Sequence, residues 1–567
     1  MATRLSDVLS FLPARLKIEG SAKQTIDVAR NRLLVGGIMF ALAFLVVGFR
    51  VVDLTVINEG REPRLANAHR LTTLEMDRAD IVDRNDVLLA TSLRTGSLYA
   101  NPRQLLDPED AARRLARALP GVNEAELLAR FRSERTFVWV KRSLTPRQQA
   151  AVNRLGIPGL FFQREERRIY PHGQIAGHIT GFTDIDNRGI AGAEQYFDER
   201  LRRSNEPVQL AIDIRAQHIL REELAHQVAE FRAIGGSAMV MDSNNGEILA
   251  MVSLPDFDSN TPALASPEAR FNRNTLGVYE MGSTFKVFTF AAALEYGTTN
   301  FNAVYDASRP IEIGRFTIHD FRGQNRRLTM PEVFMYSSNI GTVRMAMQFG
   351  RERQREFLSR LGLTRAAQFE LPEIGPPIVP NPWRDINMMT VAFGHGMAVS
   401  PLQLIAAVNA SVNGGLMVRP TLLRRPEGAE FPRERVMTAQ TSEQMRRLLR
   451  LVVERGSARS AAAPGYLVGG KTGTAEKNVR GRYRQNARMS LFAGAFPITA
   501  PRYSMLIILD EPQATARTQG FATGGWVAAP MVARLVPRLA ALWGLPPMDE
   551  TQPQVRQQLF VNAALSR

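Results

Sequence analysis

Residues 279–286 read YEMGSTFK and run directly into the apolar stretch VFTFAAALEYG, which ends at Gly297. The apolar stretch predicts a helix that stops at this glycine, so Gly282 and Ser283 lie at the N-terminus of that helix. Unpaired backbone N–H groups and the positive end of the helix dipole favour an oxyanion at such a position. Lys286, three residues further on, lies on the same helix face as Ser283, within hydrogen-bonding reach. The segment therefore predicts a serine nucleophile that is activated by a neighbouring amine.

The same segment has a simpler interpretation. Ser283 would be only a helix N-cap and Lys286 only a solvated charge, and for an isolated Ser-x-x-Lys pattern this interpretation is the better one. A second pattern, Ser-x-Asn, occurs at 337–339 inside the stretch PEVFMYSSNIGTVRMAM, for which we expect a helix. Ser337 and Asn339 add a hydroxyl and an amide, but this pattern is common in loops and caps and is weak evidence alone.

The third pattern gains its weight from how the chain uses lysine. Only six of the 71 basic residues are lysine, at positions 17, 23, 141, 286, 471 and 477, and all the others are arginine. A guanidinium does not lose its proton in proteins whereas an ε-amine can, so these lysines are candidates for chemistry that arginine cannot perform. Lys471-Thr472-Gly473 follows YLVGG, in which we expect a strand at 466–468. With so few lysines, a chance Lys-Thr-Gly is expected only about 0.02 times in the chain.

The residues of the three patterns have roles that fit one site. Burial and a second nearby cation both lower the pKa of a lysine, so Lys286 can act as a base when Lys471 is its neighbour. Thr472 and Thr474 offer hydroxyl groups to a substrate carboxylate, and Gly473 has no side chain to obstruct a substrate lying along the strand. The order Ser-x-x-Lys, Ser-x-Asn, Lys-Thr-Gly is much more specific than any of its parts.

The sequence around these motifs predicts an α+β domain. The runs SAMVMDS and EILAMVS are joined by Asn-Asn-Gly at 244–246, which predicts a tight β-hairpin. Apolar helical segments follow at 287–294 and 402–412, and strand-like runs return at 491–496 and 505–509. Strands, then helices, then strands favour a mostly antiparallel sheet packed against helices.

An apolar run near the N-terminus predicts a membrane anchor. Residues 33–48, LLVGGIMFALAFLVVG, carry no charge, and with residues 49–52 they reach the length of about 20 residues that a bilayer crossing needs. Basic residues outnumber acidic ones in 1–32, so the positive-inside bias predicts a cytoplasmic tail there and an external body after the helix. We favour an uncleaved anchor over a cleaved signal peptide, because a long charged segment precedes the run.

The catalytic motifs together resemble those of the penicillin-binding proteins and the serine β-lactamases. YEMGSTFK is similar to the nucleophile segment of that family, with Met281 where most members have proline. Residues 471–475, KTGTA, are similar to the longer form found in high-molecular-weight members. The similarity extends over most of the chain, from about residue 75 to residue 535.

Two segments outside the catalytic motifs also resemble elements of the family, and the first of them resembles class B in particular. Residues 78–85, RADIVDRN, are similar to the motif that follows the membrane anchor in class B, although Ala79 and Asp86 replace its usual glycines. Residues 189–194, GIAGAE, resemble the G-x-x-G-x-E element of the family. The fold that this resemblance implies is a transpeptidase domain, an antiparallel sheet with helices, on an elongated α+β pedestal behind one transmembrane helix.

The activity that the resemblance implies is that of a D,D-transpeptidase, which cross-links peptidoglycan stem peptides. Ser283 would attack the carbonyl of the penultimate D-Ala, Lys286 would take its proton, and the terminal D-Ala would leave. Ser337, with Lys471 and Asn339 near it, would relay a proton to the leaving amine and orient the substrate amide. An amine from a neighbouring stem peptide would then resolve the acyl-enzyme, and β-lactams would acylate Ser283 in the same way.

The resemblance also implies the oxyanion hole and the domain ranges. The backbone N–H groups of Ser283 and Thr474 would form the oxyanion hole. We expect a cytoplasmic tail at 1–32, a transmembrane anchor at 33–52, a pedestal or dimerisation-type domain at 53–231, a transpeptidase domain at 232–545 and a polar C-terminal tail at 546–567. Within the pedestal range, helical stretches at 110–118 and 124–131 and a β-like run at 136–140 are expected, without a pair of nucleophile and base.

Other functional classes fit the sequence less well. A β-lactamase is usually a soluble exported domain of about half this length and needs a base for deacylating water, which the sequence does not identify. A non-catalytic β-lactam sensor conflicts with intact Ser283, Lys286 and Lys471. The chain has no cysteine, and its seven histidines show no H-x-x-x-H spacing, so neither a zinc site nor a cofactor is expected. The net charge of +16 comes without any nucleic-acid-binding motif, so no nucleic acid partner is expected.

Within class B, both a division enzyme and an elongation enzyme remain possible. Tyr279-Glu280 and KTGTAEK at 471–477 look more like the division (septal) enzyme, which rests on resemblance alone. That identity implies a single-pass protein of the bacterial inner membrane with a periplasmic catalytic domain. No glycosyltransferase motif precedes Ser283, so a polytopic septal glycosyltransferase is expected as a separate partner, together with other division proteins.

Overall fold

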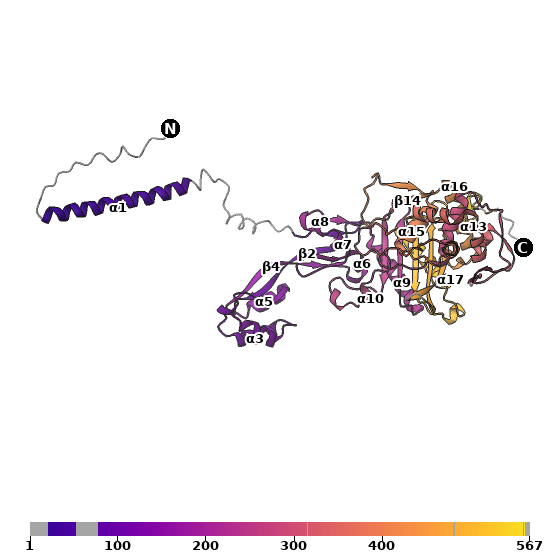
Figure 1. Ribbon diagram of the computed structural model, residues 1–567. Coiled ribbons are helices and arrows are strands. Elements are labelled where there is room, and N and C mark those ends of the chain that lie inside the picture. Colours follow the sequence, from indigo (N-terminus) through magenta and orange to yellow (C-terminus); the bar gives the residue numbers. More distant parts are fainter. Residues whose placement is uncertain (1–20, 53–76, 315, 480–481, 560, 562–567) are drawn as a thin grey trace, which may run out of the picture. The chain divides into compact units, whose positions relative to one another are not determined.

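The computed structural model describes residues 21–52, 77–314, 316–479, 482–559 and 561 of the 567-residue chain (Figure 1). The chain divides into two compact units, Met1–Glu75 and Met76–Arg567. Residues 1–20 of the predicted cytoplasmic tail and residues 53–76 at the start of the predicted pedestal lie outside the described residues.

The described part of the first unit is one helix, α1 (Ser21–Val52). Its window Arg32–Phe49 has a mean hydropathy of 2.2 and is long and apolar enough to cross a membrane. The apolar side chains in this window are exposed, for example Leu33 and Phe44. The helix begins ahead of the predicted anchor, which started at residue 33, and it ends at the predicted residue 52.

In the second unit, a five-stranded sheet forms the centre of the pedestal. The long strand β2 (Leu88–Ala100) pairs antiparallel with β1 (Ile81–Val82), β3 (Val138–Leu144) and β4 (Leu160–Ile169), and β1 pairs parallel with β7 (Val208–Gln209). The β-like run expected at 136–140 is thus the start of β3.

Three short helices cover one part of this sheet, and their ends follow from local sequence. Asp107 caps α3 (Pro108–Ala118) by accepting from the N–H groups of Glu109 and Asp110. Asn123 caps α4 (Glu124–Phe131) in the same way, and Thr145 forms a capping box at α5 (Pro146–Asn153). Apolar side chains of these helices and of the sheet form a core of their own, which includes Leu98, Leu115, Leu127, Phe131 and Leu144.

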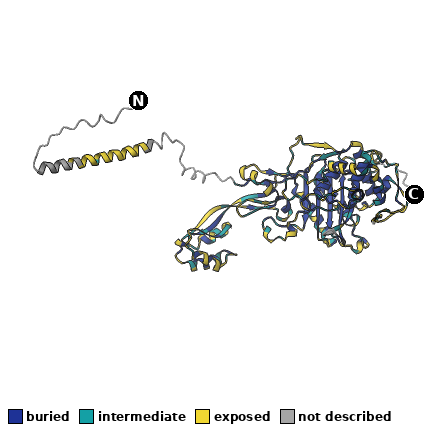
Figure 2. Ribbon diagram, viewed as in Figure 1, coloured by how far each residue is buried: buried dark blue, intermediate teal, exposed yellow. Residues whose placement is uncertain are grey.

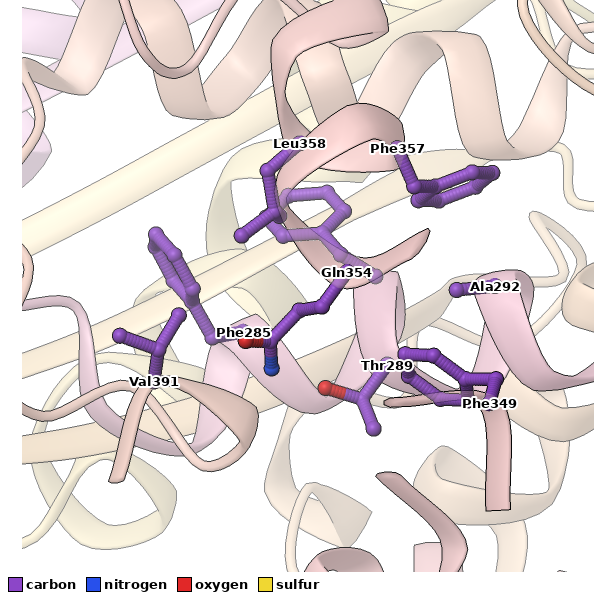
Figure 3. Close-up of a pocket in the computed structure, with 9 residues that line it drawn as sticks. Phe285, Thr289, Ala292, Phe349, Gln354, Phe357, Leu358 and Val391 are labelled. Carbon is purple, nitrogen blue, oxygen red and sulfur yellow. The ribbon is translucent and has the colours of Figure 1, made fainter. Parts of the chain in front are cut away.

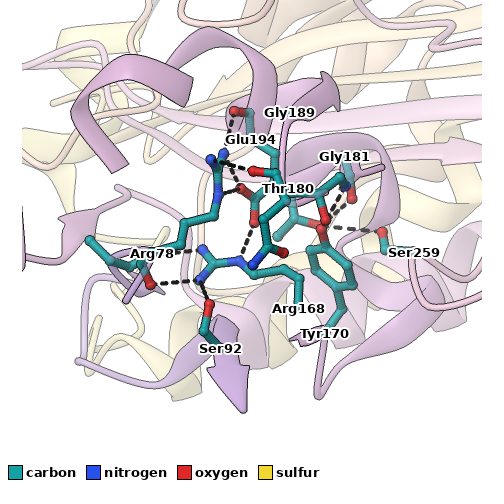
Figure 4. A network of polar contacts seen from close by, with 12 residues as sticks. Arg78, Ser92, Arg168, Tyr170, Thr180, Gly181, Gly189, Glu194 and Ser259 are labelled. Atoms are coloured by element: carbon teal, nitrogen blue, oxygen red, sulfur yellow. Dashed lines mark hydrogen bonds and ion pairs between the residues drawn. The ribbon is translucent and has the colours of Figure 1, made fainter. Parts of the chain in front are cut away.

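The two segments that resemble family elements outside the catalytic motifs meet in a buried ion-pair network (Figure 4). Arg78 donates from Nε to Glu194 at 2.7 Å, and Arg168 on β4 donates from Nε to the other Glu194 oxygen at 2.6 Å. The side chain of Glu194 is fully buried, and those of the two arginines are 2% exposed. Glu194 lies on α7 (Gly192–Tyr196), so the network joins three segments of the pedestal that are far apart in sequence.

The smaller elements of the pedestal and of the chain that follows are short. They are β5 (Phe182–Thr183), β6 (Gly189–Ala191), α6 (Gly177–Thr180), α8 (Asp198–Arg203), α10 (Pro267–Arg270), β10 (Val304–Asp306), β11 (Ile311–Ile313), β12 (Phe316–Ile318), β13 (Arg327–Thr329), β14 (Leu416–Val418) and β15 (Arg433–Arg435).

The predicted catalytic domain (232–545) is built on a second five-stranded sheet, in which every pair of neighbours is antiparallel. The strand order is β16 (Gly469–Val479), β17 (Arg482–Phe496), β18 (Tyr503–Asp510), β8 (Gly235–Asp242) and β9 (Ile248–Leu254). The predicted hairpin at 244–246 joins β8 to β9, as expected. The strands and the helices around them contain most of the buried residues (Figure 2). The prediction of an α+β fold with an antiparallel sheet is confirmed.

Helices pack against this sheet and against one another. The predicted apolar helices are α11 (Lys286–Glu295) and α15 (Pro401–Val412), and α15 contacts β8, β17 and β18. The other helices of the domain are α12 (Met330–Met335), α13 (Asn339–Arg360), α14 (Asp385–Ala392), α16 (Ala439–Arg455), α17 (Gly524–Val527) and α18 (Ala529–Leu542).

Three details differ from the sequence expectations. Residues 466–468 are not a strand, because β16 begins at Gly469 and contains the Lys-Thr-Gly motif itself. Helix α9 (Ile214–Glu230) falls in the range expected for the pedestal, yet it packs against β8, β9 and α18 of the catalytic domain.

The third difference concerns the predicted polar tail. Residues 546–559 include the helix α19 (Pro553–Leu559), whose Val555 is buried. Glu550 pairs with Arg450 of α16 at 2.8 Å and accepts a hydrogen bond from the N–H of Gly465. The described part of this segment is therefore packed onto the catalytic domain, because one apolar side chain and one carboxylate have partners there.

Candidate active site

Ser283 lies on a single turn of 3-10 helix, η6 (Gly282–Phe285), which leads directly into α11. Two glycines allow the close packing of this turn. Gly282 has a φ of +51°, and a Cβ there would lie 2.5 Å from the carbonyl oxygen of Thr474 on β16. Gly394 has a φ of +90°, and a Cβ there would lie 1.9 Å from the carbonyl oxygen of Gly282. The turn is thus held between β16 and the segment after α14, which fixes the position of Ser283.

Lys286 is fully buried, and its amine is surrounded by four oxygen atoms. Nζ lies 3.2 Å from Oγ of Ser283, 3.1 Å from Oγ of Ser337, 2.5 Å from the carbonyl oxygen of Ser337 and 2.7 Å from Oδ1 of Asn339. The structure therefore brings together Ser283, Lys286, Ser337 and Asn339, four of the residues that the sequence analysis singled out.

The environment of Lys286 favours its neutral form. Burial, and next the charge of Lys471, hold the pKa of Lys286 well below its usual value, against the opposing effect of Asp320. A neutral amine has two N–H groups and one lone pair. The carbonyl oxygens of Ser337 and Asn339 can only accept hydrogen bonds, so they suit the two N–H groups. The lone pair is then available to accept the hydroxyl proton of Ser283, as a general base requires.

Ser337 lies in a turn, and the helix predicted for this stretch is interrupted there. Its φ of +60° is left-handed, between the end of α12 at Met335 and the start of α13 at Asn339. The helical stretch expected here is therefore two helices, and the second begins where Ser338 caps α13 by accepting from the N–H of Gly341 at 3.0 Å. The turn directs both the carbonyl oxygen and the hydroxyl of Ser337 toward Lys286.

Asp320 is a residue of the site that the sequence analysis missed. Its carboxylate accepts from the Ser338 hydroxyl at 2.7 Å and from the backbone N–H groups of Asn339 at 2.5 Å and Ile340 at 2.9 Å. The Asn339 side chain donates to the carbonyl oxygen of the neighbouring His319 at 2.9 Å. Asp320 therefore caps α13 and holds the Ser-x-Asn turn. It lies in a polar loop without periodicity, so no local pattern indicated it.

Lys471 approaches the same hydroxyl from β16. Its Nζ donates to Oγ of Ser337 at 3.0 Å and to the carbonyl oxygen of Thr472 at 3.2 Å. The side chain is fully buried, and burial lowers the pKa of Lys471 to about 7. Ser337 thus links the two buried amines, of Lys286 and Lys471.

The remaining motif residues line β16. The hydroxyl of Thr472 forms a hydrogen bond of 2.7 Å with that of Ser457, and the hydroxyl of Thr474 accepts from the N–H of Gly524 at 3.1 Å. Both threonine hydroxyls thus have partners within the protein. A Cβ on Gly473 would lie 2.7 Å from the carbonyl oxygen of Met281. The absence of a side chain at Gly473 therefore allows β16 to pack closely on the nucleophile turn, which is the turn η6 that carries Ser283.

Lys477, the last lysine of the chain, has a different environment. Its amine pairs with Asp510 at 2.7 Å and with Glu511 at 2.9 Å. Although burial opposes it, the hydrogen bonds to these two carboxylates raise the pKa of Lys477. This lysine is a charged link between β16 and the end of β18.

A small cavity lies behind the nucleophile turn (Figure 3). Its volume of about 10 Å³ is bounded by Phe285, by α11 and by Phe349 and Phe357 of α13. The amide of Gln354, which also lines it, is satisfied by the carbonyl oxygen of Met388 and by the indole N–H of Trp383. A space of this size holds at most one water molecule, so it is a packing gap and no substrate site.

Among the described residues, no group of three or more His, Asp or Glu side chains could hold a metal ion. The described site consists of amines, hydroxyls, an amide and the carboxylate of Asp320.

Two family models match consecutive parts of the chain. The penicillin binding protein transpeptidase domain matches residues 236–536, and the penicillin-binding protein dimerisation domain matches residues 73–228. The chain belongs to the penicillin-binding protein transpeptidase family. The predicted resemblance to class B members of this family is confirmed.

Curated relatives and solved structures agree with this family. The chain is 42% identical over 487 residues to the probable peptidoglycan D,D-transpeptidase FtsI of Caulobacter vibrioides, covering 83% of this chain and 82% of the relative. It is 30% identical over 541 residues to the peptidoglycan D,D-transpeptidase FtsI of Escherichia coli K12, covering 88% and 90%. Penicillin binding protein 3 of Mycobacterium tuberculosis, solved with aztreonam, superimposes with a TM-score of 0.67 at 24% identity, covering 84% and 98%. That structure supports the fold.

Proposed function

We propose that this chain is a peptidoglycan D,D-transpeptidase that cross-links stem peptides through an acyl-enzyme on Ser283, at the division septum. One observation carries the proposal: the buried amine of Lys286 lies 3.2 Å from Oγ of Ser283. The peptidoglycan substrate is that of the curated relatives, and the FtsI name of two of them supports division over the elongation alternative.

In the acylation step, Lys286 takes the hydroxyl proton of Ser283 while Oγ forms a bond to the carbonyl carbon of the penultimate D-Ala. The backbone N–H groups of Ser283 and Thr474 stabilise the oxyanion. The bond to the terminal D-Ala then breaks, and the leaving nitrogen receives a proton through the hydroxyl of Ser337. Lys471 and Lys286 both contact this hydroxyl, so it can pass a proton between them and the substrate.

The second half of the reaction runs the same groups in reverse. The amine of a neighbouring stem peptide attacks the acyl-enzyme, loses a proton to the site, and Ser283 leaves with a proton from Lys286. Asn339 orients the substrate amide. Thr472 and Thr474 bind the substrate carboxylate. The Thr474 hydroxyl accepts from the N–H of Gly524 and so keeps its own proton for the carboxylate, and the Thr472 hydroxyl, which is hydrogen-bonded to Ser457, donates to the same carboxylate. The absent side chain of Gly473 lets β16 pack directly on the turn that carries Ser283.

Labelling with a fluorescent penicillin tests the function. The wild-type chain forms a covalent adduct that survives denaturation, and Ser283→Ala forms none. Ser457→Ala, which removes only the partner of Thr472, is the matched control and keeps its label. An adduct on Ser283→Ala would show that another residue is the nucleophile and would overturn the assignment.

The cellular arrangement is also a proposal, supported by α1 and by the charge bias of residues 1–32. Residues 33–52 anchor the protein once in the inner membrane, with 1–32 in the cytoplasm and the pedestal (53–231) and transpeptidase domain (232–545) in the periplasm, followed by residues 546–567. A polytopic septal glycosyltransferase and other division proteins are the partners. A fluorescent fusion that marks the lateral wall evenly and not midcell would contradict the division role.

A further inference from the structure

Two loops next to the catalytic groups meet in a cation–π contact. The guanidinium carbon of Arg322 lies 4.4 Å from the centre of the Phe521 ring. Arg322 is exposed and Phe521 is half-buried. A pair in such a setting shifts an equilibrium about two- to fivefold, the equivalent of about 0.5–1 kcal/mol. The contact is therefore strong enough to bias a loop position and weak enough to open readily.

Arg322 is tied to the Ser-x-Asn side of the site. Two residues before it, Asp320 accepts hydrogen bonds from the Ser338 hydroxyl and from the N–H groups of Asn339 and Ile340. Asn339 is also a partner of the Lys286 amine. The loop that carries Arg322 is thus held to the turn that contains Ser337, Ser338 and Asn339.

Phe521 is tied to the opposite side, formed by β16 and β17. Its neighbour Ala522 accepts from the Ser490 hydroxyl of β17 at 2.5 Å, and Gly524 donates to the Thr474 hydroxyl of β16 at 3.1 Å. The Phe521 ring also stacks on Trp526, with centroids 6.3 Å apart and planes 16° apart. The loop that carries Phe521 is thus held to β16, the strand along which the substrate is proposed to lie.

The catalytic serine lies between these two sides. Lys286, next to Ser283, binds Asn339 on the one side, and the turn of Ser283 packs on Thr474 on the other. We propose that the Arg322–Phe521 contact is a latch that bridges the two sides of the site and must part before a donor peptide can lie along β16. The latch rests on the proposed function, and it regulates access to that same site.

Rates of acylation by fluorescent penicillin on the full-length protein test the latch. In Arg322→Ala and in Phe521→Leu, the second-order acylation rate rises about two- to fivefold. The double variant gains no more than either single variant, because both changes break the same contact. The matched control is Arg353→Ala, which removes the cation–π contact of Arg353 with Tyr296 at the other end of α11 and leaves the rate unchanged.

Three outcomes of that comparison overturn the latch. An unchanged rate in Arg322→Ala means that the contact does not limit access. A lower rate means that Arg322 is a substrate contact and not a gate. Two single increases that multiply in the double variant mean that the residues act independently.

A reversible cross-link gives an independent test, because the chain contains no cysteine. The variant R322C/F521C is bridged with a thiol-cleavable bis-methanethiosulfonate reagent. Bridging slows labelling of Ser283 at least tenfold, and reduction restores it, whereas each single cysteine variant treated alike labels at its untreated rate. A bridged protein that labels at full rate overturns the latch. Absence of label on the untreated wild-type chain overturns the proposed function instead.

Discussion

The role proposed for Lys286 depends on a lone pair and not on a positive charge. Lys286→Arg places a permanent positive charge where burial favours a neutral amine, and a guanidinium has no lone pair for the Ser283 proton. We expect its acylation rate by penicillin to fall by about 10²–10⁴-fold, the usual contribution of a general base. The matched control is Lys477→Arg, because the two carboxylates that pair with Lys477 accept a guanidinium equally well. Near wild-type acylation by Lys286→Arg would exclude the base role, and thermal unfolding of each variant separates this loss from misfolding.

The charge of Asp320 tunes the same amine. Asp320 raises the pKa of Lys286, against burial and Lys471, which lower it. Asp320→Asn removes this charge, so the pKa of Lys286 falls further and more of the amine is neutral at a given pH. We therefore expect the acid side of the pH–rate profile of acylation to move to lower pH. A profile that stays in place or moves to higher pH would contradict this coupling.

A comparison of Asp320→Ala with Asp320→Asn separates the effect of the charge from the effect of the helix cap. It removes the hydrogen bonds to Ser338, Asn339 and Ile340 as well as the charge, which costs about 0.5–2 kcal/mol of stability as other lost helix caps do. We expect a lower plateau rate in addition to the shifted profile, since the Ser-x-Asn turn loses its anchor. A plateau equal to that of Asp320→Asn would mean that only the charge matters.

At the scale of elements, glycines decide how the nucleophile turn packs. Gly394→Ala places a methyl group 1.9 Å from the carbonyl oxygen of Gly282 at a φ of +90°. The turn must move, so we expect loss of penicillin labelling with the fold of the pedestal retained. The control is Gly414→Ala, with the same φ of +90° but open space around the added Cβ. Equal labelling of both alanine variants would show that the contact at Gly394 is unimportant.

The sequence predicted an element correctly where residues within that element determine its structure, and failed where contacts with distant residues determine it. The helix after Ser283 and the 244–246 hairpin follow from periodicity and turn residues, and both were predicted. The helical stretch expected around Ser337 is present but divided into α12 and α13, because Ser338 and the distant Asp320 cap a new helix there. The 466–468 strand was wrong because an apolar run alone does not show where sheet pairing starts. The roles of Asp320 and Gly394 come from tertiary contacts that no single segment reveals.

In the pedestal, the ion-pair network of Arg78, Arg168 and Glu194 joins the segments 78–85 and 189–194. Glu194→Ala leaves the buried guanidinium groups of Arg78 and Arg168 without their shared carboxylate, and breaking a buried pair in this way costs about 3–5 kcal/mol. We expect a lower midpoint in denaturant unfolding. The control is Glu199→Ala, whose pair with Arg203 is exposed and adds little to stability. Equal midpoints for the two variants would show that the network does not stabilise the pedestal.

At the scale of the whole molecule, the proposed catalytic groups and the predicted anchor belong to different units. Ser283, Lys286, Ser337, Asn339 and Lys471 all lie in the unit Met76–Arg567, whereas α1 lies in the unit Met1–Glu75. The hydrogen bonds described around Ser283 join residues of the second unit alone. We therefore expect acylation to proceed without α1.

A chain that starts at Met76 tests this separation. We expect it to fractionate with soluble proteins while the full-length chain fractionates with membranes, because it lacks the apolar window of α1. It should still acylate with fluorescent penicillin at a rate close to that of the full-length chain, and Ser283→Ala in the shortened chain should not label. If the shortened chain folds, as judged by a cooperative thermal transition, but fails to label, residues 1–75 contribute to the site. If it labels but stays with membranes, a surface of the second unit binds the membrane as well.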